Sequence, residues 1–305
     1  MDKFFGISLF SGAMGLDLGL EKSGVELKLA QEISPTFAET IKANKKNVLV
    51  GDINEIVDSD SSCRTLLKAA KISKKDLFLL SGGPPCQSFS TAGNRGLTKD
   101  PRGGCVYTFL NVVAALKPRF FVFENVRGLA SAKIKIGRKS EILIIEDLIK
   151  KFSNLGYQVE SSIVDSVDYG APQHRDRLLI IGSLHHEGIF IPKPSYFQTH
   201  QNPDLRWKTL KEAIGDLENK PGDCTKFSEK RKLIMQKIPE GGNWRDLPLK
   251  LQKQAMGAAF DASGGRTAYY RRLSYAFPSP TLTGSPTHRG TTLCHPKKHR
   301  PLSVP

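Results

Sequence analysis

The sequence predicts an α/β protein with a mostly parallel, doubly wound sheet and a smaller, irregular second domain. Short apolar stretches alternate with helix-like stretches up to about residue 182, a pattern typical of a parallel sheet with helices on both faces. After Ser183, prolines, glycines and short helical pieces replace this alternation. The length of 305 residues is enough for one large and one smaller domain.

The predicted elements follow from the apolar periodicity. We expect strands over residues 4–10, 25–31, 47–50, 77–80, 119–123, 157–164 and 177–182. We expect a first helix that ends near residue 22 and further helices over residues 35–44, 63–70, 106–116 and 142–155. The last two strands have little between them, which favours one antiparallel pair at an edge. The polar, Gly-rich stretch 88–104 is expected to be a mobile loop, and a domain boundary is expected within 184–192.

The charge balance points to a polyanionic partner. The formal net charge is +15, and residues 184–305 hold 20 Lys and Arg against 10 Asp and Glu. Nucleic acid is the expected partner, since we find neither a basic amphipathic helix nor an apolar run that could span a membrane. The five cysteines show no CxxC spacing, which favours a reducing cytoplasm and gives no zinc module. The His and Cys residues between 288 and 299 match no familiar metal site.

One short loop carries a candidate nucleophile. The apolar run Leu77–Leu80 is followed by two glycines, two prolines and Cys86. Glycine allows a sharp turn and proline stiffens the chain, so the thiol is expected at the carboxyl edge of the sheet, where open α/β folds bind ligands. A rigidly mounted cysteine favours a nucleophile. A buried structural cysteine is the alternative.

A Gly-rich turn and two acids favour an adenosine-containing cofactor. The segment 10–15, FSGAMG, follows the first strand and opens the first helix, where glycines let a ligand approach the backbone. Glu32 ends the second strand and can accept hydrogen bonds from ribose hydroxyls. Asp52 follows the third strand and can accept from an adenine amino group. Either acid alone could instead be a helix cap or a solvated turn residue.

Two further stretches carry charged side chains at strand ends. Glu124 interrupts an apolar strand, and a buried carboxylate has to be hydrogen-bonded or protonated. A protonated carboxyl could give a proton to a substrate, whereas a structural acid is the alternative. The segment 173–177, QHRDR, alternates Arg175 and Arg177, which could hold a base edge, a phosphate or the cysteine loop. A surface ion-pair ladder with Asp176 is also open.

These stretches together resemble the DNA cytosine-5 methyltransferase family of bacterial restriction–modification systems. The resemblance rests on FSGAMG at 10–15, GPPCQ at 83–87, ENV at 124–126 and QHRDR at 173–177, in the family's order and spacing. The segment PTLT at 280–283 resembles a Thr-Leu element of the family's variable recognition region. The resemblance implies a Rossmann-like, S-adenosylmethionine-dependent catalytic domain over 1–186 and a target-recognition domain over 187–305.

The resemblance also implies roles for individual residues. Cys86 would add to carbon 6 of a flipped cytosine in double-stranded DNA, Glu124 would protonate or hydrogen-bond ring nitrogen 3, and Arg175 and Arg177 would hold the base and the loop. S-adenosylmethionine would be bound by Phe10, Ser11, Gly12, Gly15, Leu16, Glu32, Asp52, Ile53 and Pro84. DNA would be contacted by Gln87, Ser88, Ser90, Arg95, Thr281 and Leu282. No metal is implied.

Two departures from the family pattern bear on these expectations. Met14 stands where the family usually has glycine, which could narrow the cofactor turn. The segment 300–304 resembles the start of a shared block that breaks off at Pro305. We therefore expect the remaining motifs to come either from a second polypeptide or from a longer form of this same chain. A catalytically silent DNA-binding subunit and a tRNA cytosine methyltransferase are the alternative functions, and the DNA target sequence is not readable.

Overall fold

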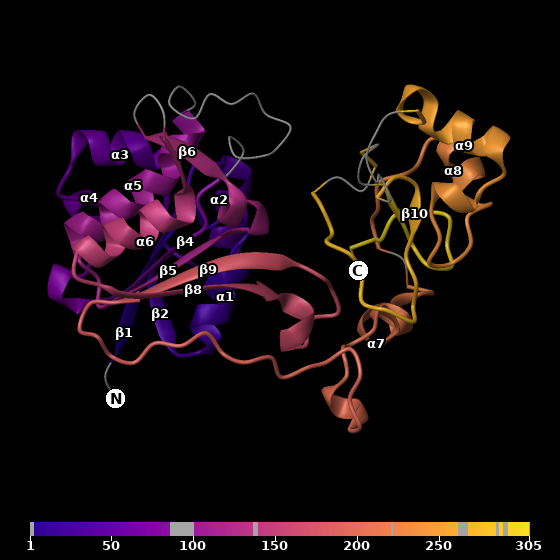
Figure 1. Cartoon of the computed structure of the whole chain (residues 1–305). Coiled ribbons are helices and arrows are strands. Elements are labelled where there is room, and N and C mark those ends of the chain that lie inside the picture. The colour runs from indigo at the N-terminus through magenta and orange to yellow at the C-terminus, as the bar shows by residue number, and fades with distance from the viewer. Residues whose placement is uncertain are drawn as a thin grey trace. The chain divides into compact units, whose positions relative to one another are not determined.

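The computed structural model describes residues 3–85, 101–136, 140–220, 222–261, 268–284, 287–288 and 292–304 (Figure 1). The chain divides into two compact units. Unit 1 comprises Met1–Val164 and Asp176–Pro192, and unit 2 comprises Asp165–Arg175 and Lys193–Pro305. The short segment between residues 165 and 175 therefore belongs to unit 2, although its flanking strands belong to the sheet of unit 1.

Unit 1 is built on a seven-stranded sheet with the strand order β3-β2-β1-β4-β5-β9-β8. Its strands are β1 (Phe4–Leu9), β2 (Val25–Glu32), β3 (Val48–Val50), β4 (Leu77–Gly82), β5 (Phe120–Val126), β8 (Gln158–Asp165) and β9 (Asp176–Ser183). The strands from β3 to β5 are parallel, and β9 is antiparallel to β5. The mostly parallel, doubly wound sheet is confirmed. The antiparallel strand β9 lies between β5 and β8, and β8 is the last strand at this edge of the sheet.

Helices cover both faces of this sheet, as expected. They are α1 (Gly15–Lys22), α2 (Pro35–Ala43), α3 (Ile53–Ser59), α4 (Arg64–Ala70), α5 (Pro101–Leu116) and α6 (Ile144–Asn154). The neighbouring residues Leu29 and Ala30 of β2 face opposite sides, because side chains alternate along a strand. Leu29 joins the main core with residues of α3 to α6, which Figure 1 shows gathered together, and Ala30 joins a small cluster with Ile41 of α2.

The main core is dense in aromatic rings. Phe121 of β5 stacks on Phe152 of α6 with ring centroids 4.3 Å apart, and Phe109 of α5 meets Phe123 edge-on at 5.4 Å. Ile144, Leu148 and Phe152 recur every fourth residue along α6 and are fully buried, so one stripe of this helix faces the sheet. This packing fixes β5, the strand that carries Glu124.

Three expectations about elements need correction. The helix expected over 142–155 begins at Ile144, because residues up to Leu143 form β7 (Ser140–Leu143), antiparallel to β6 (Lys133–Ile136). The loop expected over 88–104 ends by Pro101, where α5 begins, and proline suits a first helical turn. Helix α3 was not expected. Asp52 caps it by accepting a hydrogen bond from the Asn54 amide.

Unit 2 contains short elements and much irregular backbone. Its helices of five or more residues and its strands, in the described part of the chain, are α7 (Leu210–Ile214), α8 (Glu229–Met235), α9 (Leu249–Met256), β10 (Arg271–Arg272) and β11 (Leu293–Cys294). The Arg272 side chain is buried and donates to the backbone carbonyls of Ile238, His295 and Lys298. A buried cation with several acceptors holds these irregular segments together. Within the described ranges, none of the helices is both long and apolar enough to cross a membrane.

The pairing of β5 with β9 makes a prediction about stability. Gly182 lies opposite Phe121, and a Cβ at residue 182 would be 2.0 Å from Cε1 of that ring. We expect Gly182→Ala to lower the free energy of unfolding by about 1–3 kcal/mol, as overpacking does. The matched control is Gly19→Ala in α1, where a Cβ meets nothing within 4 Å and alanine should stabilise the helix by roughly 0.5–1 kcal/mol.

Urea denaturation of the two variants beside the parent protein measures both changes. An unchanged urea midpoint for Gly182→Ala would show that the β5–β9 register differs from the one described.

Candidate active site at the carboxyl edge of the sheet

The candidate site residues of unit 1 lie at one edge of the sheet. Strands β1 to β5 are parallel, so their carboxyl ends meet at the same edge. The chain order reverses between β1 and β4, because β2 and β3 follow on one side and β4 and β5 on the other. Such a switch point opens the crevice in which open α/β sheets bind ligands. Glu32, Asp52 and Glu124 all lie at this edge.

The Gly-rich turn after β1 is fastened to the end of β2. Phe10, Gly12 and Met14 adopt left-handed backbone angles, with φ values of 54°, 55° and 67°. The Gly12 amide donates to Oε2 of Glu32 at 2.7 Å, and the Ser34 amide donates to Oε1 at 2.8 Å. Each carboxylate oxygen has a second lone pair that remains available to a ligand hydroxyl. The turn and the acid expected to bind the cofactor are therefore brought together.

Some residues of that turn lie at the carboxyl edge of the sheet, whereas the side chain of Met14 is buried in the core. Gly15 and Leu16 begin α1, and the Ser11 amide donates to the Gln31 carbonyl at 3.1 Å. Met14 keeps the left-handed angle that usually calls for glycine, but its side chain is buried against Ala30 and Ile41. The methionine side chain therefore packs in the core.

The third strand ends at the second expected acid. Asp52 is half-buried, and its Oδ1 accepts from the backbone amide of Asn54 at 2.8 Å and from the side-chain amide of the same residue at 2.9 Å. The Ile53 side chain is buried in the main core. Any contact of Ile53 with a ligand at the carboxyl edge of the sheet would therefore come from its backbone. Asp52 is thus both a helix cap and an acceptor at the edge of the sheet.

A buried acid beneath the turn was missed in the sequence. Asp17 of α1 is 1% exposed, and its Oδ1 accepts from the Ser8 hydroxyl at 2.6 Å, which in turn accepts from the Ser11 hydroxyl at 2.9 Å. Burial raises the pKa of the Asp17 carboxyl, against the opposing effect of these hydroxyls. The sequence offered one signal for a buried acid here, because Asp17 stands between two leucines, Leu16 and Leu18, in the predicted first helix.

The start of the cysteine loop is held by the neighbouring strand. Gly83 and Pro84 follow β4, and the buried Asn125 side chain donates from Nδ2 to the Pro84 carbonyl at 2.9 Å. A Cβ at Gly83 would be 2.9 Å from Oε2 of Glu124, so any larger residue at position 83 would require the carboxylate to shift. Asn125 was missed as a site residue, although it lies within the ENV sequence.

Glu124 and Arg177 form an ion pair at this edge. Arg177 Nε lies 2.6 Å from Glu124 Oε1, and both side chains are largely shielded, with 19% and 28% exposed. Arg177 follows the first residue of β9, which runs antiparallel beside β5 and therefore starts where β5 ends. A charge-assisted bond of this kind fixes the orientation of the carboxylate. The neighbouring Asp176 pairs with Arg127 at 3.1 Å.

Arg175 lies in unit 2, in contrast to Arg177. Its backbone amide donates to Asp165 Oδ1 at 2.8 Å, and His174 Nδ1 lies 2.8 Å from the other oxygen of that carboxylate. The Thr281 hydroxyl donates to the His174 carbonyl at 2.7 Å. The Thr-Leu element is therefore attached to the first part of the QHRDR segment, residues 173–175, which belongs to unit 2. Leu282, the next residue, has an exposed side chain.

Several expected site residues lie outside the described residues. They are the nucleophile Cys86 and the expected DNA contacts Gln87, Ser88, Ser90 and Arg95. Among the residues that are described, no group of three His, Cys, Asp or Glu side chains is arranged to hold a metal ion.

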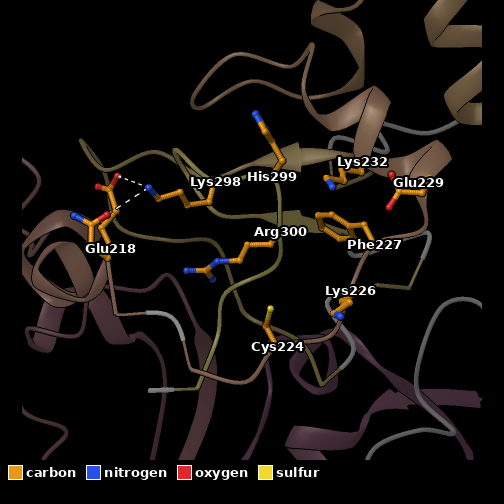
Figure 2. A pocket seen from close by; sticks show the side chains of 10 residues that line it. Glu218, Cys224, Lys226, Phe227, Glu229, Lys232, Lys298, His299 and Arg300 are labelled. Carbon is orange, nitrogen blue, oxygen red and sulfur yellow. Dashed lines mark hydrogen bonds and ion pairs between the residues drawn. The ribbon is translucent and has the colours of Figure 1, made fainter.

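Unit 2 contains a basic pocket of about 660 Å³ (Figure 2). Its charged lining residues are Glu218, Lys226, Glu229, Lys232, Lys298 and Arg300. Lys298 is already bound to Glu218 at 3.7 Å and to the Asn219 side chain at 3.5 Å. Figure 2 shows the Arg300 guanidinium extending toward the side of Glu218, and its Nη1 donates to the Pro301 carbonyl at 2.9 Å. Because the remaining lysines form no ion pair with a described carboxylate, the pocket suits an anion.

Comparison with known proteins agrees with this geometry. The family model for C-5 cytosine-specific DNA methylase matches residues 4–305. The chain is 34% identical to the Type II methyltransferase M.Sau96I of Staphylococcus aureus over 97% of its length and 64% of that protein. It is also 34% identical to the Type II methyltransferase M.PspPI of a Psychrobacter species, over 98% of its length and 68% of that protein. The chain thus spans about two thirds of the length of these relatives.

A solved structure extends the comparison to the fold. A DNA modification methyltransferase encoded within an Escherichia coli prophage aligns over 98% of this chain and 86% of its own, with a TM-score of 0.60 and 21% identity. This likeness supports the Rossmann-like fold. With the family match over residues 4–305, the chain belongs to the C-5 cytosine-specific DNA methylase family.

Proposed function

We propose that this protein transfers a methyl group from S-adenosylmethionine to carbon 5 of cytosine at a specific site in double-stranded DNA, as part of a restriction–modification system. The observation that carries the proposal is the placement of Glu124. Its carboxylate is bound to Arg177 at 2.6 Å and lies against Gly83, three residues before Cys86. A candidate acid thus lies beside the start of the loop that carries the candidate nucleophile, on β5, the strand next to the switch point between β1 and β4.

The residues at the other side of the switch point fit the adenosine part of the cofactor. Glu32 keeps lone pairs for the two ribose hydroxyls, and Asp52 Oδ2 has no hydrogen-bond partner among the described residues. The left-handed backbone angles in the turn at 10–15 suit a close approach of a ligand to the backbone, and Pro84, two residues after β4, is proposed to contact the cofactor. When bound, S-adenosylmethionine supplies an activated methyl group.

The cysteine and the acid together make carbon 5 reactive. The Cys86 thiolate adds to carbon 6 and breaks the carbon 5–carbon 6 double bond, while Glu124 gives a proton to ring nitrogen 3. Carbon 5 then carries the electron density needed to form a bond to the donor's methyl group, whose bond to sulfur would break and leave S-adenosylhomocysteine. Loss of its proton to a base afterwards restores the double bond and expels Cys86, and the proton on nitrogen 3 returns to Glu124. Arg177 holds Glu124 in place throughout, and Arg175 contacts the base or the loop.

The target base has to leave the duplex before this chemistry, because carbon 6 is stacked between neighbouring bases. Gln87, Ser88, Ser90 and Arg95, on the loop after Cys86, are proposed to close around the DNA. Thr281 and Leu282 are proposed to contact it from unit 2, together with the basic pocket. The roles of the two units, the cytoplasmic location and the second polypeptide expected from the sequence stay predictions.

A methyl-transfer assay tests the proposal and separates it from its alternatives. Purified protein is incubated with labelled S-adenosylmethionine and either duplex DNA or tRNA, and the DNA product is sequenced for 5-methylcytosine. We expect label in DNA at one recurring sequence. Label in tRNA alone would favour the tRNA methyltransferase, and DNA binding with no label in either substrate would favour a silent DNA-binding subunit.

Replacing Glu124 by Gln tests the proposed acid. Glutamine keeps the shape and can accept from Arg177, but it cannot deliver a proton to nitrogen 3. We expect the rate of methyl transfer to fall by about 10²–10⁴-fold, the range for a lost general acid, with DNA affinity nearly unchanged. Single-turnover rates and a fluorescence binding assay measure the two quantities. A collapse in affinity with a normal rate per bound complex would instead make Glu124 a DNA-binding residue.

The salt dependence of DNA binding tests the basic pocket. If Lys226 and Lys232 each bind a phosphate, the plot of log affinity against log salt should become shallower by about 0.9 when either lysine is removed. We therefore expect a lower slope for Lys226→Ala and for Lys232→Ala. Lys230→Ala is the matched control, since Lys230 is exposed on the same helix as Lys232 but does not line the pocket. Equal slopes for all three variants and the parent would place the phosphate-binding residues elsewhere.

A further inference from the structure

The two oxygens of the Asp52 carboxylate have different surroundings. Oδ1 accepts two hydrogen bonds from Asn54, from the backbone amide at 2.8 Å and from Nδ2 at 2.9 Å. Oδ2 has no hydrogen-bond partner among the described residues. The carboxylate is therefore held in one orientation by a single neighbouring residue, and one oxygen is left to meet a ligand.

The Asn54 side chain is itself fixed from helix α5. The Thr108 hydroxyl donates to Asn54 Oδ1 at 2.5 Å, and Asn54 Nδ2 also lies 3.6 Å from the Cys105 sulfur. Cys105 and Thr108 are one helical turn apart and nearly buried, with 7% and 8% exposed. The Thr108 hydroxyl can donate to the amide oxygen, whereas the Asp52 carboxylate can accept only from the amide nitrogen. The two contacts therefore select one of the two orientations of the Asn54 amide.

We propose that Asn54 and Thr108 are positioning residues through which this protein recognises the 6-amino group of the donor's adenine. Asn54 holds Asp52 Oδ1, and Oδ2 accepts a hydrogen bond from the amino group. Thr108 acts one step further away by holding Asn54. This inference rests on the proposed function, in which Asp52 contacts the cofactor, and it adds the residues that give Asp52 its selectivity.

These hydrogen bonds also connect helix α5, which follows the cysteine loop, with Asp52 at the end of β3. Helix α5 begins at Pro101, directly after the segment that contains Cys86. Its residues Cys105 and Thr108 contact Asn54, which begins α3 together with Ile53 and binds the capping carboxylate of Asp52. A helix that follows the cysteine loop thus supports the end of the sheet that would bind adenine.

The test compares two ligands by calorimetry. One is S-adenosylhomocysteine, and the other is its purine analogue, which lacks only the 6-amino group. For the parent protein we expect the adenine ligand to bind roughly tenfold more tightly, because the analogue leaves a carboxylate oxygen without its donor. For Asn54→Ala and for Thr108→Val we expect this ratio to fall to about twofold. Thr108→Ser keeps the hydroxyl and should restore the ratio.

The ratio of the two ligand affinities distinguishes a loss of positioning of Asp52 from a general loss of protein stability. Asn47→Ala is the matched control, since Asn47 also donates from its side chain to two carbonyls, those of Lys28 and Ala69, just before β3. We expect that variant to lose stability in urea while its ratio stays equal to the parent's. Thr108→Val, which is nearly isosteric, serves if Asn54→Ala does not fold.

Three outcomes would each overturn a different part of this proposal. A parent protein that binds neither ligand would overturn the proposed function itself. A parent that binds both ligands equally would overturn recognition of the amino group at Asp52. The third outcome is a parent that prefers the adenine ligand while Asn54→Ala and Thr108→Val prefer it equally strongly. That result would overturn only the positioning roles of Asn54 and Thr108.

Discussion

The close approach of the Glu124 carboxylate to the cysteine loop is the constraint on which the catalytic part of the site depends. One of its oxygens is 2.6 Å from Arg177 Nε, and the other would be 2.9 Å from a Cβ at Gly83. The carboxylate lies there undisturbed because residue 83 has no side chain, and because β9 runs antiparallel beside β5, which brings Arg177 to the end of the strand. Sheet topology, a glycine and an ion pair therefore act together to orient one acid.

Other polar groups at the same edge are held in the same way, each by a partner close by. Asn125 holds the Pro84 carbonyl, Glu32 holds the Gly12 amide, and Asn54 holds Asp52. These hydrogen bonds make the edge rigid, because moving any of the bonded groups leaves a donor or acceptor without its partner. A preorganised edge of this kind suits a reaction in which a methyl donor and a base have to meet in a fixed geometry.

Much of this architecture was predictable from the sequence, because strand alternation and the glycine, acid and arginine positions are local signals. The sheet, its helices and the order of Glu32, Asp52 and Glu124 followed from them. The helix α3, the β6–β7 hairpin and the true start of α6 did not, since short elements depend on tertiary pairing such as that of Ile134 with Ile142. Asp17, Asn54 and Asn125 were missed because their partners, for example Thr108, are distant in sequence and meet only in the folded chain. The placement of Arg175 and Arg177 in separate units likewise has no local signal.

The central claim is that Cys86 forms a covalent bond to the cytosine that Glu124 activates. Duplex DNA that contains 5-fluorocytosine at the methylated position tests it most directly, because the fluorine cannot leave as the proton does and the adduct is trapped. In the presence of S-adenosylmethionine, mass spectrometry should find one chain joined to one DNA strand with one added methyl group, and peptide mapping should locate the bond at Cys86. Cys86→Ser should give no adduct while still binding S-adenosylhomocysteine. Methylation of ordinary DNA without any trapped adduct, or a bond at another residue, would contradict the claim.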